Sequence, residues 1–204
     1  MSPNYRAAWI PSTVVMTDLD DTLRRVIAWA EADGSEHNIQ GLLVADTQRP
    51  VFDNPLLTAF TKRHAIATPR GGQRLMNGAV VAFFPTLRAF DLAMKAAAGG
   101  SLTLIEHPST PLHGWAAEAS ALNLLDPDWE HPPLQLELDS AVDSLAFEGH
   151  NGYGPAPDRK AALRILGDLR SAGLLDMELI AGVLVARGVS FRSVERLQKL
   201  ANSI

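Results

Sequence analysis

The sequence predicts a doubly wound α/β domain followed by a helical module. Short apolar runs without polar alternation recur along the first 125 residues, and each is followed by a span with helical spacing. After Leu125 the pattern stops, and two Pro-rich and Gly-rich stretches follow. We therefore expect an α/β domain at 1–125 with a mainly parallel five-stranded sheet covered by helices on both faces, a connector at 126–157 and three short helices at 158–204.

The expected elements alternate along the chain in a Rossmann-like manner. Strands are expected near residues 13–17, 41–46, 64–68, 79–84 and 101–106. Helices are expected after Asp18 and at 53–63, 86–98, 111–122, 158–172, 176–187 and 190–201, with Asp158, Asp176 and Ser190 as caps of the last three. The pattern of residues 134–147 fits either a strand or a helix, and the sequence leaves this open.

Composition limits the class of protein. Apolar residues make up 47% of the 204 residues, which excludes a disordered chain, and no apolar run approaches the roughly 20 residues of a membrane helix. The absence of cysteine excludes disulfides and thiolate metal sites. The first residues lack a secretory signal pattern, so we expect a soluble, cytoplasmic protein without a membrane partner.

Charge is unevenly distributed along the chain. The net charge is −5, which argues against a uniformly basic surface for nucleic acid. Residues 158–204 carry eight Lys or Arg and five Asp or Glu, a net charge of +3, so the first 157 residues carry −8. Such asymmetry is typical of a separate interaction module.

Three carboxylates follow the first apolar run, in the segment Asp18-Leu19-Asp20-Asp21-Thr22-Leu23. This segment resembles the first motif of the haloacid-dehalogenase-like phosphohydrolases. The resemblance implies that Asp18 is a nucleophile toward phosphorus and Asp20 an acid/base, with Thr47 in the second motif. It also implies a Mg²⁺ ion that offsets the charge repulsion, held by Asp18, Asp20 and a late carboxylate, for which Asp139 is the candidate.

The same residues have a structural interpretation. Thr17 or Asp18 would cap a helix, and the other acids would lie in its first turn, where the helix dipole favours negative charge. The late acidic pair of the phosphohydrolases is matched only by Asp139 and Asp143. The sequence leaves open whether the chain is an enzyme.

The carboxyl ends of the expected strands are candidate ligand positions, because open parallel sheets bind ligands at that edge. Thr68, Arg70, Glu106 and His107 are the candidates. The turn at 68–74 contains two Gly and could hold an anion, or it is an ordinary exposed loop. Glu106, His107 and His113 could hold a metal, or form a polar turn after a strand.

The segment Gly188 to Leu197 resembles the turn and second helix of helix-turn-helix DNA-binding domains. Arg192, Arg196 and Lys199 fall on one helical face, so the resemblance implies contacts with DNA or RNA phosphates. The alternative is a capped amphipathic helix with a solvated basic face. We therefore expect a binding protein that acts on nucleic acid through its tail, with a Mg²⁺-dependent phosphohydrolase or a protein-interaction subunit as alternatives.

Overall fold

The computed structural model describes residues 3–12, 18–72 and 77–204 and divides them into two compact units. The sheet unit contains residues 3–111 and 119–130. The helical unit contains residues 112–118 and 131–204. The chain therefore leaves the sheet unit at residue 112, returns at residue 119 and leaves again at residue 131.

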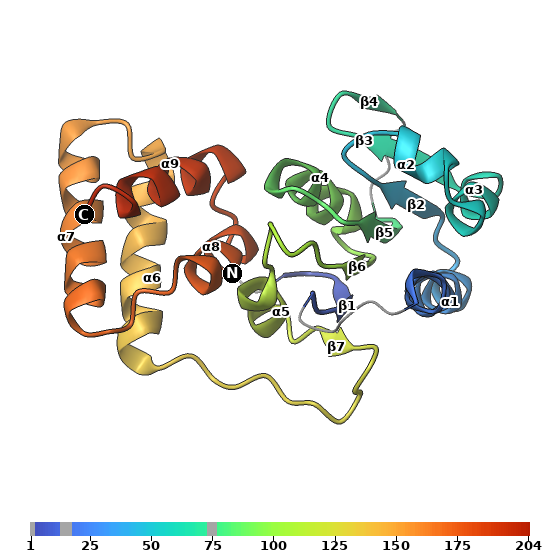
Figure 1. Cartoon of the computed structure of the whole chain (residues 1–204), viewed down its shortest axis with the longest axis horizontal. Helices are drawn as coiled ribbons and strands as arrows, with labels where there is room; N and C mark the ends of the chain where they lie inside the picture. Colours follow the sequence, from blue (N-terminus) through green and yellow to red (C-terminus); the bar gives the residue numbers. More distant parts are fainter. Residues whose placement is uncertain (1–2, 13–17, 73–76) are drawn as a thin grey trace. The chain divides into compact units, whose positions relative to one another are not determined.

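Seven strands form one sheet in the sheet unit (Figure 1). They are β1 (Arg6–Ile10), β2 (Gly41–Val44), β3 (Ala65–Thr68), β4 (Gly71–Gly72), β5 (Ala79–Phe83), β6 (Ser101–Ile105) and β7 (Leu122–Asn123). Their order is β4-β3-β2-β5-β6-β1-β7, and all pairs are parallel except β3 with β4. The predicted α/β class with a mainly parallel sheet is confirmed.

The predicted number of five strands is wrong. Strands β2, β3, β5 and β6 lie where apolar runs predicted them, whereas β1, β4 and β7 were not predicted. The strand expected at 13–17 lies outside the described residues. Strand β1 is buried from Ala7 to Ile10 and begins with a charged residue, while β4 and β7 have two residues each, too few to produce an apolar run.

The helices of the sheet unit cover both faces of the sheet. They are α1 (Leu19–His37), α2 (Arg49–Phe52), α3 (Pro55–Thr61) and α4 (Leu87–Ala97). The connections from β1 to β2 and from β2 to β3 run in one direction across the sheet, and the connection from β5 to β6 runs in the other. Because parallel crossovers are right-handed, α1 and α3 lie on one face and α4 on the opposite face (Figure 1).

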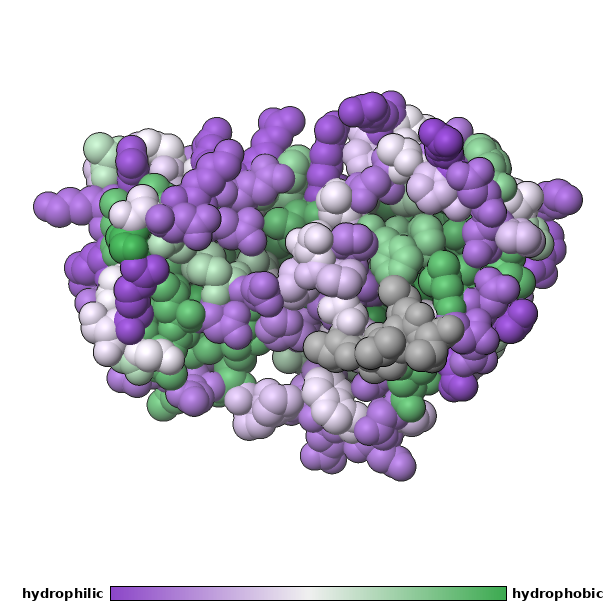
Figure 2. Space-filling model, viewed as in Figure 1, coloured by the Kyte–Doolittle hydropathy of each residue, from purple (hydrophilic) through white to green (hydrophobic). Residues whose placement is uncertain are grey.

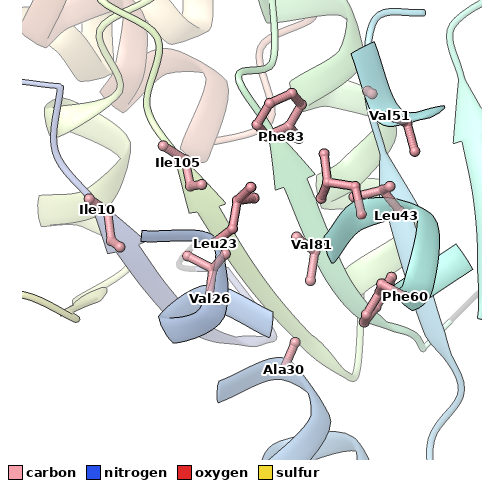
Figure 3. Packing of buried hydrophobic residues seen from close by; sticks show 12 residues of the cluster. Ile10, Leu23, Val26, Ala30, Leu43, Val51, Phe60, Val81, Phe83 and Ile105 are labelled. Atoms are coloured by element: carbon pink, nitrogen blue, oxygen red, sulfur yellow. The ribbon is translucent and has the colours of Figure 1, made fainter. Parts of the chain in front are cut away.

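One core cluster lies between the sheet and the pair α1 and α3. Leu23 and Val26 of α1 and Phe60 of α3 pack against Leu43 and Val81 of the central strands (Figure 3). Each of these side chains is at most 1% exposed. Burying a side chain of this size contributes about 1.5–3 kcal/mol, so this face of the sheet supplies much of the unit's stability.

The helical unit contains five α-helices and one short 3-10 helix. They are α5 (His113–Glu118), α6 (Leu136–Glu148), η1 (Gly149–Asn151), α7 (Ala156–Ser171), α8 (Met177–Ala186) and α9 (Phe191–Ala201). The segment that fitted a strand or a helix is therefore helical. The three predicted tail helices exist, but they share a compact unit with α5 and α6, so a module of three helices is too small.

Helix α8 lies at the centre of the helical unit. Its residues from Ile180 to Ala186 are all buried. At Gly182 an added Cβ would lie 2.7 Å from the backbone nitrogen of Trp115, so only glycine allows α5 to approach this closely. Asp176 and Ser190 cap α8 and α9 as predicted, whereas α7 begins at Ala156, before the predicted cap Asp158.

Each helix in the described part of the chain is too short or too polar to span a lipid membrane.

Candidate functional site

Asp18 lies at the start of α1 and acts as its N-cap. Its Oδ1 accepts a hydrogen bond of 3.0 Å from the backbone N–H of Asp21, and its carbonyl accepts one of 3.0 Å from the Thr22 hydroxyl. Asp20 lies in the first turn, where negative charge interacts favourably with the helix dipole. This is the arrangement that the structural interpretation predicts for these residues.

The Mg²⁺ ligands expected from the phosphohydrolase motif are not grouped in the described residues. Across residues 3–12, 18–72 and 77–204, no three His, Asp or Glu side chains gather as a metal site would require. Asp18 and Asp20 belong to the sheet unit, whereas Asp139 belongs to the helical unit. The Mg²⁺ site and the roles of Asp18, Asp20 and Thr47 therefore stay predictions from the sequence.

The carboxylate of Asp46, which follows β2, lies at the amino end of α4. Its carboxylate accepts hydrogen bonds from the backbone N–H of Thr86, at 3.0 Å, and from the Thr86 hydroxyl, at 2.5 Å. Thr86 itself caps α4 through Ala89. A carboxylate of the chain thus lies where helix amides would otherwise attract a phosphate. Thr47, the neighbour of Asp46, is exposed.

Glu106 and His107 follow β6 at the same edge of the sheet. Glu106 is 2% exposed, and its Oε2 accepts a hydrogen bond of 2.7 Å from the backbone N–H of Ser12. The Nδ1 of His107 accepts one of 3.0 Å from Ser109, and its ring packs edge-on against Phe84 with centroids 5.7 Å apart. His113 belongs to the helical unit.

Thr68 and Arg70 form the turn between β3 and β4. The Thr68 hydroxyl donates to the carbonyl of Gly71 at 3.0 Å and accepts from the backbone N–H of Arg70 at 3.3 Å. These bonds close a tight antiparallel hairpin, and the Arg70 side chain is exposed. Part of the expected anion cradle, residues 73–76, lies outside the described residues, so the cradle stays a prediction.

Helix α9 presents the basic face that the sequence predicted. Gly188 has φ +87°, and the Ser190 hydroxyl accepts the backbone N–H of Ser193 at 3.2 Å, which starts the helix. Val194 and Leu197 are buried. The side chains predicted to bind nucleic acid are all exposed, namely Arg192, Arg196 and Lys199. One of them, Arg196, donates a hydrogen bond to the carbonyl of Gly152.

Arg187 joins three helices of the helical unit. Its guanidinium lies 2.9 Å from Glu118, 2.5 Å from Asp139 and 2.7 Å from Asp143, and its side chain is only 12% exposed. Burial lowers the pKa of Arg187, but hydrogen bonds to Glu118 and Asp139, together with the negative charges of these two carboxylates, outweigh burial and raise it above the ordinary value. Asp139, the candidate metal ligand, therefore serves in a structural ion-pair cluster here.

The outer face of α6 carries two large apolar side chains that sequence reasoning missed. Leu136 is 82% exposed and Phe147 is 80% exposed. Residues eleven positions apart differ by only about 20° around a helix, so both point to the same side. Ser140 and Asp143 lie between them on this face. We call this surface, defined by Leu136, Ser140, Asp143 and Phe147, the α6 outer face.

Apolar side chains also appear on the surface in the space-filling view. Figure 2 shows hydrophobic side chains between hydrophilic ones on the viewed side of the helical unit. Next to the turn before α9, a hollow of about 430 Å³ is lined by Phe147, His150, Val189 and Ser190, among others. The apolar residues of this unit are therefore not confined to its core.

The helical unit as a whole is acidic. The net charge of +3 in the tail is offset by five carboxylates from α5 and α6, which carry no Lys or Arg. These five are Glu118, Glu137, Asp139, Asp143 and Glu148. The unit that contains α9 thus has a net charge of −2, which opposes binding to a phosphate backbone.

Comparison of the chain with protein-family models, curated proteins and solved structures gives no match, so its function is inferred from its own residues.

Proposed function

We propose that this chain is a protein-interaction subunit that binds a basic amphipathic helix on the α6 outer face. The single observation that carries the proposal is the exposure of Leu136 and Phe147 on one side of one helix. Single exposed apolar residues are common on protein surfaces, whereas aligned pairs with polar borders are typical of helix-binding surfaces.

Burial of these two residues by a partner would supply part of the free energy of binding. Full burial of a Leu or Phe side chain contributes about 1.5–3 kcal/mol. Leu136 and Phe147 lie about 16 Å apart along the helix axis, at a rise of about 1.5 Å per residue. A partner helix that covers both would therefore extend along most of α6.

The charge of α6 defines the chemistry of the partner. Its sequence contains four carboxylates and no Lys or Arg. Two of them, Asp139 and Asp143, pair with Arg187, while Glu137 and Glu148 lie along one border of the apolar pair. Complementary charge favours a basic partner and increases the rate of encounter.

Nucleic-acid binding through Arg192, Arg196 and Lys199 stays a prediction with less support. Three exposed cations supply few phosphate contacts, and they belong to a unit with a net charge of −2. Because affinity for nucleic acid depends on cations that replace counterions, this unit is poorly suited to it. The phosphohydrolase also stays a prediction, since the carboxylate of Asp18 caps α1.

Fluorescence anisotropy tests the proposal directly. The full chain is titrated into a labelled amphipathic peptide of Leu and Lys, an acidic Leu and Glu counterpart, and a labelled DNA duplex. Of the three labelled ligands, we expect the chain to bind only the basic peptide. The double variant Leu136→Ser with Phe147→Ser should weaken this affinity about tenfold or more, since a loss of about 1.4 kcal/mol of binding free energy corresponds to tenfold.

The double variant tests the apolar contribution alone, because it removes apolar surface without changing any charge. Equal binding of the basic peptide by the wild type and this variant would contradict the proposal. Salt-sensitive binding of the duplex without binding of the peptide would assign the helical unit to nucleic acid instead.

A further inference from the structure

We infer that the partner is a second copy of this chain, whose α9 lies against the α6 outer face. This inference rests on the proposed function and adds the identity of the partner. It follows from the fact that the helical unit carries both an acidic helix with apolar anchors and a basic amphipathic helix. The helical unit therefore carries both the acidic helix α6 and, on α9, a basic surface of opposite charge.

The outer surface of α9 has the composition that the α6 outer face requires. Arg192, Arg196 and Lys199 form an exposed basic stripe, and the inward side is closed by Val194 and Leu197. At about 100° per residue, partly buried Leu200 borders this stripe on one side, and on the other side exposed Glu195 lies between the stripe and partly buried Phe191. The exposed surface of α9 thus offers three cations and one carboxylate with an apolar residue on each flank, whereas α6 offers apolar anchors with acidic borders.

The dimensions of the two surfaces agree. Helix α6 has 13 residues and α9 has 11, so they have similar lengths. Arg192 and Lys199 lie about 10 Å apart along α9, which is shorter than the roughly 16 Å between Leu136 and Phe147. The basic stripe is therefore short enough to lie between the two apolar anchors, with Glu137 and Glu148 near its two ends. Asp139 and Asp143, which lie between the anchors, also pair with Arg187.

A dimer with a twofold axis would contain the contact between α6 and α9 twice. If α9 of one copy lies on α6 of its partner, symmetry places α9 of the partner on α6 of the first copy. One helix pair alone is small compared with the roughly 1,200–2,000 Å² of stable interfaces, so repetition of the contact is needed for a lasting dimer. The acidic and basic patches then neutralise each other, which makes the association sensitive to salt.

Sedimentation equilibrium of the full chain tests the inference, with circular dichroism to verify that each variant is folded. We expect the wild type to form a dimer that weakens as salt is raised. Leu136→Ser with Phe147→Ser, and separately Arg192→Glu with Lys199→Glu, should each weaken dimerisation about tenfold or more. The matched control is Arg159→Glu with Lys160→Glu on α7, two exposed cations outside the stripe, which should leave the dimer unchanged.

Three results would overturn the inference that the partner is a second copy. A wild type that is monomeric at all concentrations, yet binds the basic peptide, overturns the second copy as partner and leaves the proposed function standing. A dimer that is lost in the α6 variant but retained in the α9 variant also overturns it. A monomeric chain whose α9 variant alone loses affinity for duplex DNA assigns the basic stripe to nucleic acid and likewise overturns the inference.

Discussion

The carboxyl edge of the sheet and the α6 outer face differ in whether their side chains already have partners within the chain. At the sheet edge, carboxylates that could bind a ligand accept hydrogen bonds from the chain itself: Asp18 from Asp21, Asp46 from Thr86 and Glu106 from Ser12. On α6, two large apolar side chains remain about four-fifths exposed. These three carboxylates are therefore engaged within the fold, whereas the two apolar side chains on α6 are not covered by their own unit.

This difference shows that residue type alone does not separate a ligand-binding carboxylate from one that stabilises the fold. A carboxylate at a strand end stabilises the fold when a helix amino terminus lies beside it. An apolar residue on the outside of a helix has no such internal use, and local departures from expected patterning are typical of functional surfaces. If the polar groups stabilise the fold and the apolar pair binds a partner, substitution of the polar groups should change stability and substitution of the apolar pair should change binding.

The largest expected effect is the loss of the Arg187 cluster. Arg187→Ala should lower the free energy of unfolding by about 2–4 kcal/mol, because three carboxylates lose their shared cation. Urea unfolding measures this, with the exposed Arg159→Ala as a control that should change stability by less than about 0.5 kcal/mol. A variant as stable as the wild type would mean that the cluster does not hold the helices together.

The effect of Asp33→Asn should be smaller and dependent on pH. Arg6 binds the Asp33 carboxylate through two nitrogens, at 2.5 and 3.0 Å, and joins β1 to α1. Burial raises the pKa of Asp33, but the hydrogen bonds from Arg6 and Ser101, together with the charges of Arg6 and His37, outweigh burial and lower it. The substitution should cost about 1.5–3 kcal/mol at neutral pH, since hydrogen bonds to charged groups contribute that much.

The sign of the pH dependence follows from the lowered pKa. Asp33 stabilises the folded state fully above its unfolded pKa of about 3.9, and this contribution is lost as pH falls through the lower folded pKa. The stability of the wild type should therefore fall more steeply below about pH 4 than that of Asp33→Asn. Parallel curves in denaturant unfolding from pH 2 to 7 would show that Asp33 is not ion-paired.

Apolar runs revealed most of the sheet before the structure did. Strands β2 and β5 are buried on both faces and have continuous apolar sequences, whereas β6 is fully buried but includes Ser101 and Thr103, and β3 alternates between buried and partly buried residues. Strand β1 was missed because it begins with Arg6, and the apolar run at 14–16 was interpreted as the first strand instead. Strands β4 and β7 have only two residues each and form by pairing with a neighbouring strand, so the local sequence does not predict them.

The candidate surface was hidden for a different reason. Leu134, Leu136 and Leu138 alternate with polar residues, which is typical of a strand, although the residues after them follow helical spacing. Without the helix, the exposed side of Leu136 and Phe147 could not be identified. The Arg187 cluster likewise joins α5, α6 and α8, which lie far apart in the sequence.

A smaller effect should follow from changes at Asp18. Asp18→Ala should lower stability by about 1 kcal/mol through the lost cap, and Asp18→Asn by a few tenths, because Asn caps helices almost equally well. Thermal unfolding measures both. Mg²⁺-dependent phosphatase activity that Asp18→Asn abolishes would contradict a purely structural role and support the phosphohydrolase.

Reciprocal charge reversal tests the central claim most directly. One variant carries Glu137→Lys with Glu148→Lys on α6, and the other carries Arg192→Glu with Lys199→Glu on α9. Alone, each variant would place like charges on both facing helices, so each should sediment as a monomer. Mixed in equal amounts, the two variants become complementary at both contacts of a twofold dimer. Analytical ultracentrifugation of the mixture should therefore show a heterodimer, and two monomeric species in the mixture would contradict the pairing of α6 with α9.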